Sequence, residues 1–187
     1  MKGRLAKAGL EYLGMVDRAA PLVPPRLAAF ANSTAAEGHE WAVSVENEAP
    51  DFGERLNHEW YMLCAQQGLF AVDDPQFLLA VAEGTEASGE SWWARVRLRS
   101  EWDFGGAGAA AMVTGRGHGH PEFVMLSLDG TLVVRGSQGQ EWTDIVCLEN
   151  PHEVPAFREL GAQLTASGLT PARTRAALSR WLEVTRH

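Results

Sequence analysis

The sequence predicts one α+β domain, in which a mixed or antiparallel sheet of five to six strands is covered by one internal helix and two C-terminal helices. The main observation is Asp129-Gly130, which lies between two apolar runs and is a strong signal for a β-hairpin, because both residues of such a loop must tolerate positive φ. With a two-residue loop, Leu126 faces Val133, and both faces of the hairpin are largely apolar. A sheet of this kind must be covered on both sides, so we expect helices or a second sheet to pack on it.

Composition supports a single globular domain. The chain has 187 residues, of which 45% are apolar and 21% charged, and this length lies within the range of single domains. We expect residues 1–187 to divide into a helical N-terminal extension, a sheet region with one helix, and a C-terminal helical pair, at residues 1–36, 37–149 and 150–187.

In the first half of the chain, spacing indicates two helices and three strands. Leu5, Leu10, Leu13 and Val16 recur at helical intervals, and Pro21 ends the run, which predicts a helix over residues 4–20. Alternating residues predict a strand near a sheet edge over 41–46. A capping pattern at Asp51, a helical apolar face and Gly68 predict a helix over 51–67. Strands are expected over 76–83 and 91–104.

In the second half, the hairpin is followed by a third strand over residues 142–148. Apolar residues at helical spacing then predict a helix over 153–167. Thr170-Pro171 is a compact helix start, with a hydroxyl at the N-cap and proline at the first helical position, and it predicts a last helix over 172–184.

Cysteine usage and apolar run lengths favour a cytoplasmic protein. Cys64 and Cys147 are too few for a disulfide framework and are interpreted as reduced core residues. No signal-peptide pattern and no uncharged apolar run of membrane-spanning length is found, so no membrane partner is expected.

Negative charge is concentrated in one segment. The net charge is −8, and residues 37–90 contain twelve acidic residues and one basic residue, Arg55. We do not expect nucleic acid as a partner of the whole domain, because phosphate binding needs a positive field.

The strand over residues 91–104 supplies one candidate binding surface. Strand alternation places Trp93, Arg95, Arg97 and Arg99 on one face, and Trp102 follows. Tryptophan and arginine are common anchors of protein interfaces, so these five residues are a candidate docking surface. The alternative is structural, with the arginines paired across the sheet with the acids of residues 83–90 or of the 40s.

A second candidate is a metal site in the loop before the hairpin. His118 and His120 can both reach one divalent ion if the backbone is extended, and Glu122 follows them. Asp103, Asp144 or His152 would complete the site, and the bound ion would activate water. The alternative is a solvated loop without a ligand. No other cofactor is indicated.

The glycine-rich run 106–111 matches G-x-G-x-x-A, but it lacks the βαβ context of a dinucleotide-binding loop. We interpret it as small residues that allow close packing.

The leading hypothesis for function is therefore a non-enzymatic, acidic, protein-binding module of the bacterial cytosol, such as an adaptor, a chaperone or an immunity-type inhibitor. It would act through the Trp/Arg strand residues and the acidic segment. The alternative is a metal-assisted hydrolase or small-ligand-binding protein that uses the His118 and His120 loop. The oligomeric state is open, and a subunit of a larger assembly is a third hypothesis.

Overall fold

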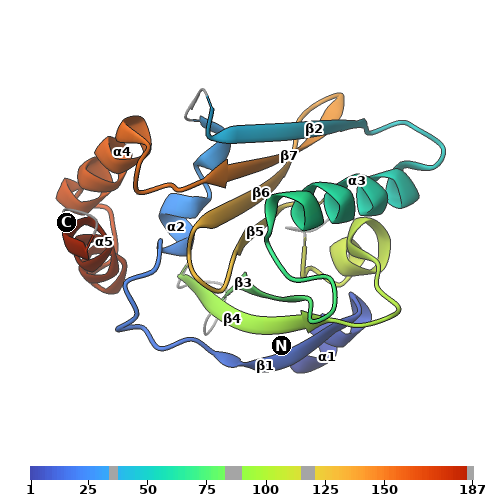
Figure 1. Ribbon diagram of the computed structural model, residues 1–187, viewed down its shortest axis with the longest axis horizontal. Coiled ribbons are helices and arrows are strands. Elements are labelled where there is room, and N and C mark those ends of the chain that lie inside the picture. The colour runs from blue at the N-terminus through green and yellow to red at the C-terminus, as the bar shows by residue number, and fades with distance from the viewer. Residues whose placement is uncertain (34–37, 83–89, 115–120, 185–187) are drawn as a thin grey trace.

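The computed structural model describes residues 1–33, 38–82, 90–114 and 121–184. They form an α+β fold around one antiparallel sheet of seven strands, in the order β1-β4-β3-β5-β6-β7-β2 (Figure 1). The strands are β1 (Leu10–Met15), β2 (Glu40–Glu46), β3 (Gln76–Ala82), β4 (Ser91–Leu98), β5 (Phe123–Leu126), β6 (Leu132–Gln138) and β7 (Trp142–Glu149). The α+β class is thus confirmed, with one strand more than expected.

The additional strand lies where the sequence predicts a helix. Residues 4–20 form α1 (Lys2–Lys7) and then β1, which pairs with β4, so the N-terminal segment is part of the sheet and not a helical extension. The chain changes direction at Gly9, where φ is +76° and a Cβ atom would lie 2.2 Å from the carbonyl oxygen of Glu101. Only glycine fits this backbone, and pairing with β4 outweighs the helical spacing of the leucines.

The connection between β5 and β6 has a different geometry from the expected two-residue loop. Leu126 lies opposite Val133, and the chain leaves the ladder over residues 127–131. The amide of Gly130 donates to the carbonyl of Ser127 at 3.0 Å, and Gly130 alone in this segment has positive φ, at +80°. The carboxylate of Asp129 accepts from the hydroxyls of Ser127 and Thr131, at 2.5 and 2.8 Å. This is a tight turn that ends at a left-handed glycine.

One face of the sheet, here called the α3 face, packs against α3 (Phe52–Gln67). Leu56, Trp60, Leu63 and Cys64 are buried there, and Gly68 ends the helix in the left-handed conformation. The side chain of Asp51 makes no capping hydrogen bond, so the predicted capping box is wrong. Aromatic rings surround Trp60, and the closest is Phe104, at 4.1 Å between ring centroids.

The opposite face, here called the α5 face, carries α2 (Pro25–Ala28), α4 (Pro155–Ala166) and α5 (Ala172–Val184). Figure 1 shows α4 and α5 together on one side of the sheet and α3 on the other. Phe157 of α4 meets Trp181 of α5 edge to face, at 5.9 Å between centroids. Both are buried with Leu78, Leu126 and Val133 of the sheet. The two apolar faces predicted from the hairpin are thus both covered by helices, which gives three layers.

None of the helices in the described ranges combines the length and apolar character needed to cross a bilayer.

Candidate functional site

The predicted Trp/Arg surface is divided by the fold. Trp93 is fully buried on the α5 face, and its indole nitrogen donates to the carbonyl of Val23 at 2.7 Å. Trp102 is partly buried and stacks on Tyr61, at 5.7 Å between centroids. Trp93 therefore cannot contact a partner, because the chain around residue 23 covers it. Of the five predicted residues, Arg95 and Arg99 are exposed and Arg97 is half-exposed.

Arg97 and Arg95 take part in a polar network that crosses three strands. Arg97 contacts Asp74 at 3.0 Å and Glu11 of β1 at 3.3 Å, and Arg95 donates to Gln76 at 2.9 Å. The amide of Gln76 in turn donates to Asp74 at 2.6 Å. The hydrogen bond that Arg97 donates to Asp74 is the main cause that raises the pKa of Arg97. Arg97 is thus paired with acids other than those expected, Asp74 and Glu11, whereas the described partner of Arg95 is the neutral Gln76.

The predicted metal loop is only partly visible. His118 and His120 lie outside the described residues, so their geometry stays a prediction. Glu122 is described, and its carboxylate forms an ion pair with the guanidinium of Arg135, with 3.0 Å between the nitrogen and the oxygen. No three of Glu122, Asp103, Asp144 and His152 form a group that could hold a metal ion, and the described ranges contain no other such group. Because Arg135 is 9% exposed and donates to Glu122, this carboxylate is already charge-compensated.

The glycine-rich run forms a short helical turn, Phe104–Gly108, whose amides are all used internally. The carboxylate of Asp103 accepts from Gly106 and Ala107, at 2.8 and 2.7 Å, and from the amide of Asn57 at 2.8 Å. Asn57 accepts from the amides of the two residues before Gly106, at 2.9 and 2.8 Å. An anion cannot use donors that are already engaged, which argues against a phosphate loop here.

The two cysteines are free and fully buried, and both belong to the core on the α3 face. Burial raises the pKa of the Cys64 thiol well above its ordinary value of 9.0, and a hydrogen bond with Cys147 acts in the same direction. Both features make Cys64 a poor nucleophile at neutral pH.

A site that sequence reasoning located only in part is the outer edge of β2. This strand is the last in the sheet and pairs with β7 over seven residues without a bulge (Figure 1). The amide of Glu149 donates to the carbonyl of His39, and the amide of Asn47 donates to the carbonyl of Glu141. In an antiparallel edge strand, the backbone groups of successive residues point alternately toward the paired strand and away from it. In β2 the odd-numbered residues therefore bond to β7, and the backbone groups of the even-numbered residues point outward.

The outward backbone groups belong to Glu40, Ala42, Ser44 and Glu46. Ala42 and Ser44 are exposed, and no hydrogen bond from the described residues reaches their amides. One carboxylate oxygen of Glu40 is shielded from solvent and also lacks a partner within the described ranges. The edge thus presents backbone donors and acceptors between two carboxylates.

The other edge of the sheet differs. The pairing of β1 with β4 shifts register between Tyr12 and Gly14. Such irregularities bend an edge strand and make it a poor template for another strand. β2 has no bulge, lysine or proline that would hinder pairing.

Comparisons of the chain with protein families, with curated proteins and with solved structures found no match.

Proposed function

We propose that this protein is a non-enzymatic protein-binding module, of the adaptor, chaperone or immunity-inhibitor kind, and that it binds a basic, extended segment of a partner along β2. The observation that carries the proposal is the regular outer edge of β2, where the backbone groups of Ala42 and Ser44 have no partner among the described residues. Adding a strand to such an edge gives affinity through main-chain hydrogen bonds.

Charge determines which segment fits. Glu40 and Glu46 are at the two ends of the strand, Glu48 follows, and Asp144 of β7 lies directly opposite Ser44. A segment with lysine or arginine at alternate positions would place its cations beside these carboxylates, which steers association and disfavours acidic partners. The acidic excess of residues 37–90 extends this field over the neighbouring surface.

The cellular setting belongs to the same proposal. Two free cysteines in the core are typical of a reducing compartment, which supports the cytoplasm as its location. A partner protein is expected, and nucleic acid and membrane are not.

The decisive experiment compares Ala42→Pro with Val43→Pro. The amide of Ala42 points outward, so proline there removes a donor that only an added strand would use. Proline at Val43 removes an amide of the ladder with β7 and serves as the disrupted control. We expect Ala42→Pro to keep its melting temperature close to that of the wild type but to lose partner retention in a pull-down.

Hydrogen exchange measures the contact directly. In the isolated protein, the amides of Ala42 and Ser44 should exchange fast, and a retained partner should protect both. The proposal would be contradicted if Ala42→Pro retained the partner as well as the wild type does. It would also be contradicted if the complex left both amides unprotected. If retention instead fails in Arg95→Glu/Arg97→Glu, the binding surface is the arginine row of β4.

The metal-assisted alternative is tested separately. Elemental analysis and a thermal shift with zinc, manganese or EDTA should show no change if the His118 and His120 loop holds no ion. A raised melting temperature that His118→Ala abolishes would favour the alternative.

A further inference from the structure

A surface pocket lies on the α5 face, and none of the residues of the predicted sites lines it. It is enclosed by the segment that follows β1, the start of β4 and the first turn of α5. Its walls include Arg18, Arg26, Glu90, Trp92 and Arg173, together with prolines of the neighbouring turns. Three arginines and one acid are an unusual group in a protein with a net charge of −8.

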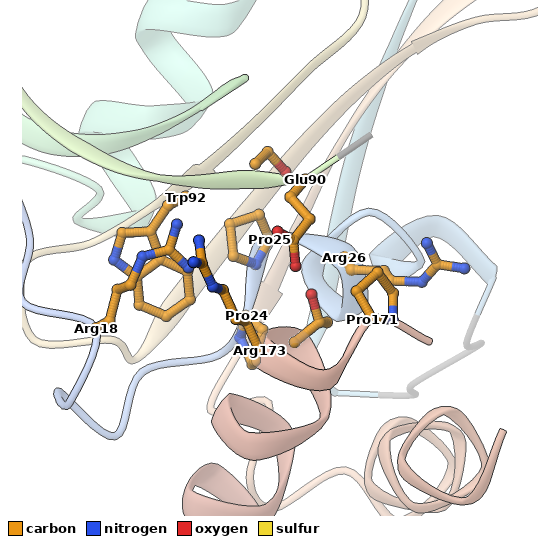
Figure 2. A pocket seen from close by; sticks show the side chains of 10 residues that line it. Arg18, Pro24, Pro25, Arg26, Glu90, Trp92, Pro171 and Arg173 are labelled. Atoms are coloured by element: carbon orange, nitrogen blue, oxygen red, sulfur yellow. The ribbon is translucent and has the colours of Figure 1, made fainter. Parts of the chain in front are cut away.

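Figure 2 shows how the charged groups are arranged. The side chains of Arg18 and Arg173 converge beside the ring of Trp92, Glu90 extends from the same end of β4 on the other side of Pro25, and Arg26 is turned away. The guanidinium carbon of Arg18 lies 5.2 Å from the centroid of the Trp92 ring. This stacking orients the guanidinium, because a cation is attracted to the face of an indole.

Two hydrogen bonds fix the backbone around Arg18. The indole nitrogen of Trp92 donates to the carbonyl of Val16 at 3.0 Å, and Arg180 donates to the carbonyl of Arg18 at 2.6 Å. The backbone that carries Arg18 is thus attached to both β4 and α5. A preorganised cation loses less entropy on binding than a mobile one.

The N-terminus of α5 adds to the positive field. The first helical bond of α5 is donated by Arg175 to Pro171, so the amides before Arg175 have no partner within the helix. The hydroxyl oxygen of Thr170, which is 3% exposed, makes no hydrogen bond with the described residues. The predicted hydroxyl cap is therefore missing, and Arg173 and Thr174 of this uncapped turn line the pocket.

We infer that this pocket binds the phosphoryl group of a small phosphate monoester, through Arg18, Arg173 and the first turn of α5. Among the residues that line the pocket, positively charged side chains outnumber the one carboxylate, Glu90, and the positive end of the α5 helix lies beside them. A phosphate monoester carries about −1.5 to −2 charges at neutral pH and has three oxygens that accept hydrogen bonds, so it can contact both guanidiniums and the helix N-terminus at once, which the two oxygens of a carboxylate cannot do. Guanidinium groups also match its oxygens in geometry.

The remaining groups define the rest of the ligand. Glu90 is an acceptor at the start of β4, across Pro25 from the two arginines, so it favours a ligand with a hydroxyl or amine close to its phosphoryl group. The site is separate from the edge of β2 and does not depend on a protein partner.

Calorimetric titration of the whole protein with inorganic phosphate, phosphoserine, serine and acetate tests the inference. We expect saturable binding of phosphate and stronger binding of phosphoserine, but no saturable binding of serine or acetate. Arg173→Ala should weaken phosphate binding by about tenfold or more, the usual effect of removing a charge-assisted hydrogen bond. Arg175→Ala is the matched control, since Arg175 is on the same helix but does not line the pocket.

Two further results distinguish the site from general charge attraction. Glu90→Gln should tighten phosphate binding, because it removes the opposing carboxylate. Binding of phosphoserine should weaken as the pH falls below the second pKa of its phosphoryl group, about 6. The inference is overturned if phosphate shows no saturable binding at about 5 mM, a concentration typical of weak ligands. It is also overturned if acetate binds equally well, or if Arg173→Ala and Arg175→Ala behave alike.

Discussion

The amide of Asn57 donates a hydrogen bond to the carboxylate of Asp103 at 2.8 Å and so joins the middle of α3 to the turn that follows β4. The same carboxylate accepts from the amides of Gly106 and Ala107. One side chain thus caps a helical turn and connects it to a helix 46 residues earlier in the chain.

We predict that Asp103→Ala lowers the free energy of unfolding by about 1–2 kcal/mol, the usual cost of losing a cap and a buried partner. Asp51→Ala is the matched control, since Asp51 precedes α3 but makes no capping hydrogen bond, and it should change stability by less. Denaturant unfolding of both variants measures the difference. Equal effects would show that the bonds of Asp103 add little.

Stability should also depend on pH through Asp103. Partial burial alone would raise the pKa of this carboxyl group, but the hydrogen bonds from Asn57, Ala107 and Gly106 outweigh it and lower the pKa below its ordinary value of 3.8. A carboxyl group whose pKa is lowered on folding stabilises the protein at pH values above its unfolded-state pKa. This stabilisation is lost as the pH falls through the pKa of the folded state. Between about pH 5 and pH 2, the wild type should therefore lose more stability than Asp103→Ala does.

Gly105 and Gly53 form a close backbone contact that should tolerate a methyl group on one side only. A Cβ atom at Gly105 would lie 2.9 Å from the carbonyl oxygen of Gly53, whereas a Cβ atom at Gly53 would meet its nearest atom at 4.0 Å. Gly105→Ala should cost about 1–3 kcal/mol by overpacking. Gly53→Ala should be neutral or stabilise α3 by up to about 1 kcal/mol. Thermal unfolding of the pair checks this, and a harmless Gly105→Ala would contradict the contact.

Arg135 is a buried cation that binds several carbonyl groups besides Glu122. Its guanidinium donates to the carbonyls of Ala29, Phe123 and Gly136, and to the carboxylate of Glu122 at 3.0 Å. We predict that Arg135→Ala lowers the free energy of unfolding by about 3 kcal/mol, because it removes a buried ion pair together with the donor that several carbonyl groups share. Arg99→Ala, at an exposed position, should change it little. Chemical denaturation compares the two, and similar midpoints would be the contrary result.

The thiols of Cys64 and Cys147 should be unreactive in the folded protein. Both are fully buried, and burial raises the pKa of Cys64, so little thiolate is present at pH 8. Ellman's reagent should label neither thiol under native conditions and both in guanidinium chloride. Fast native labelling would mean that the core around α3 opens frequently.

The sequence by itself determined the features that depend on local pattern. The helical spacing of Leu56, Trp60 and Leu63 predicts α3, and its end at Gly68 is observed, because a left-handed residue is needed there and glycine adopts that conformation at little cost. The apolar character of both faces around Leu126 and Val133 likewise required two covering layers, and both are found. The alternation over residues 41–46, with charges around it, correctly indicated an edge strand.

Only the tertiary structure decided which residues face solvent and which meet in space. Leu10 and Leu13 fit a helix in sequence, but hydrogen bonds to β4 and the constraint at Gly9 place them in a strand. Trp93 shares its strand pattern with exposed arginines, yet the turn around Val23 covers it. Arg18 and Arg173 line the same pocket because α5 lies beside the segment that follows β1, where Arg180 donates to the carbonyl of Arg18. No local pattern encodes such an encounter, since long-range packing alone selects the partners.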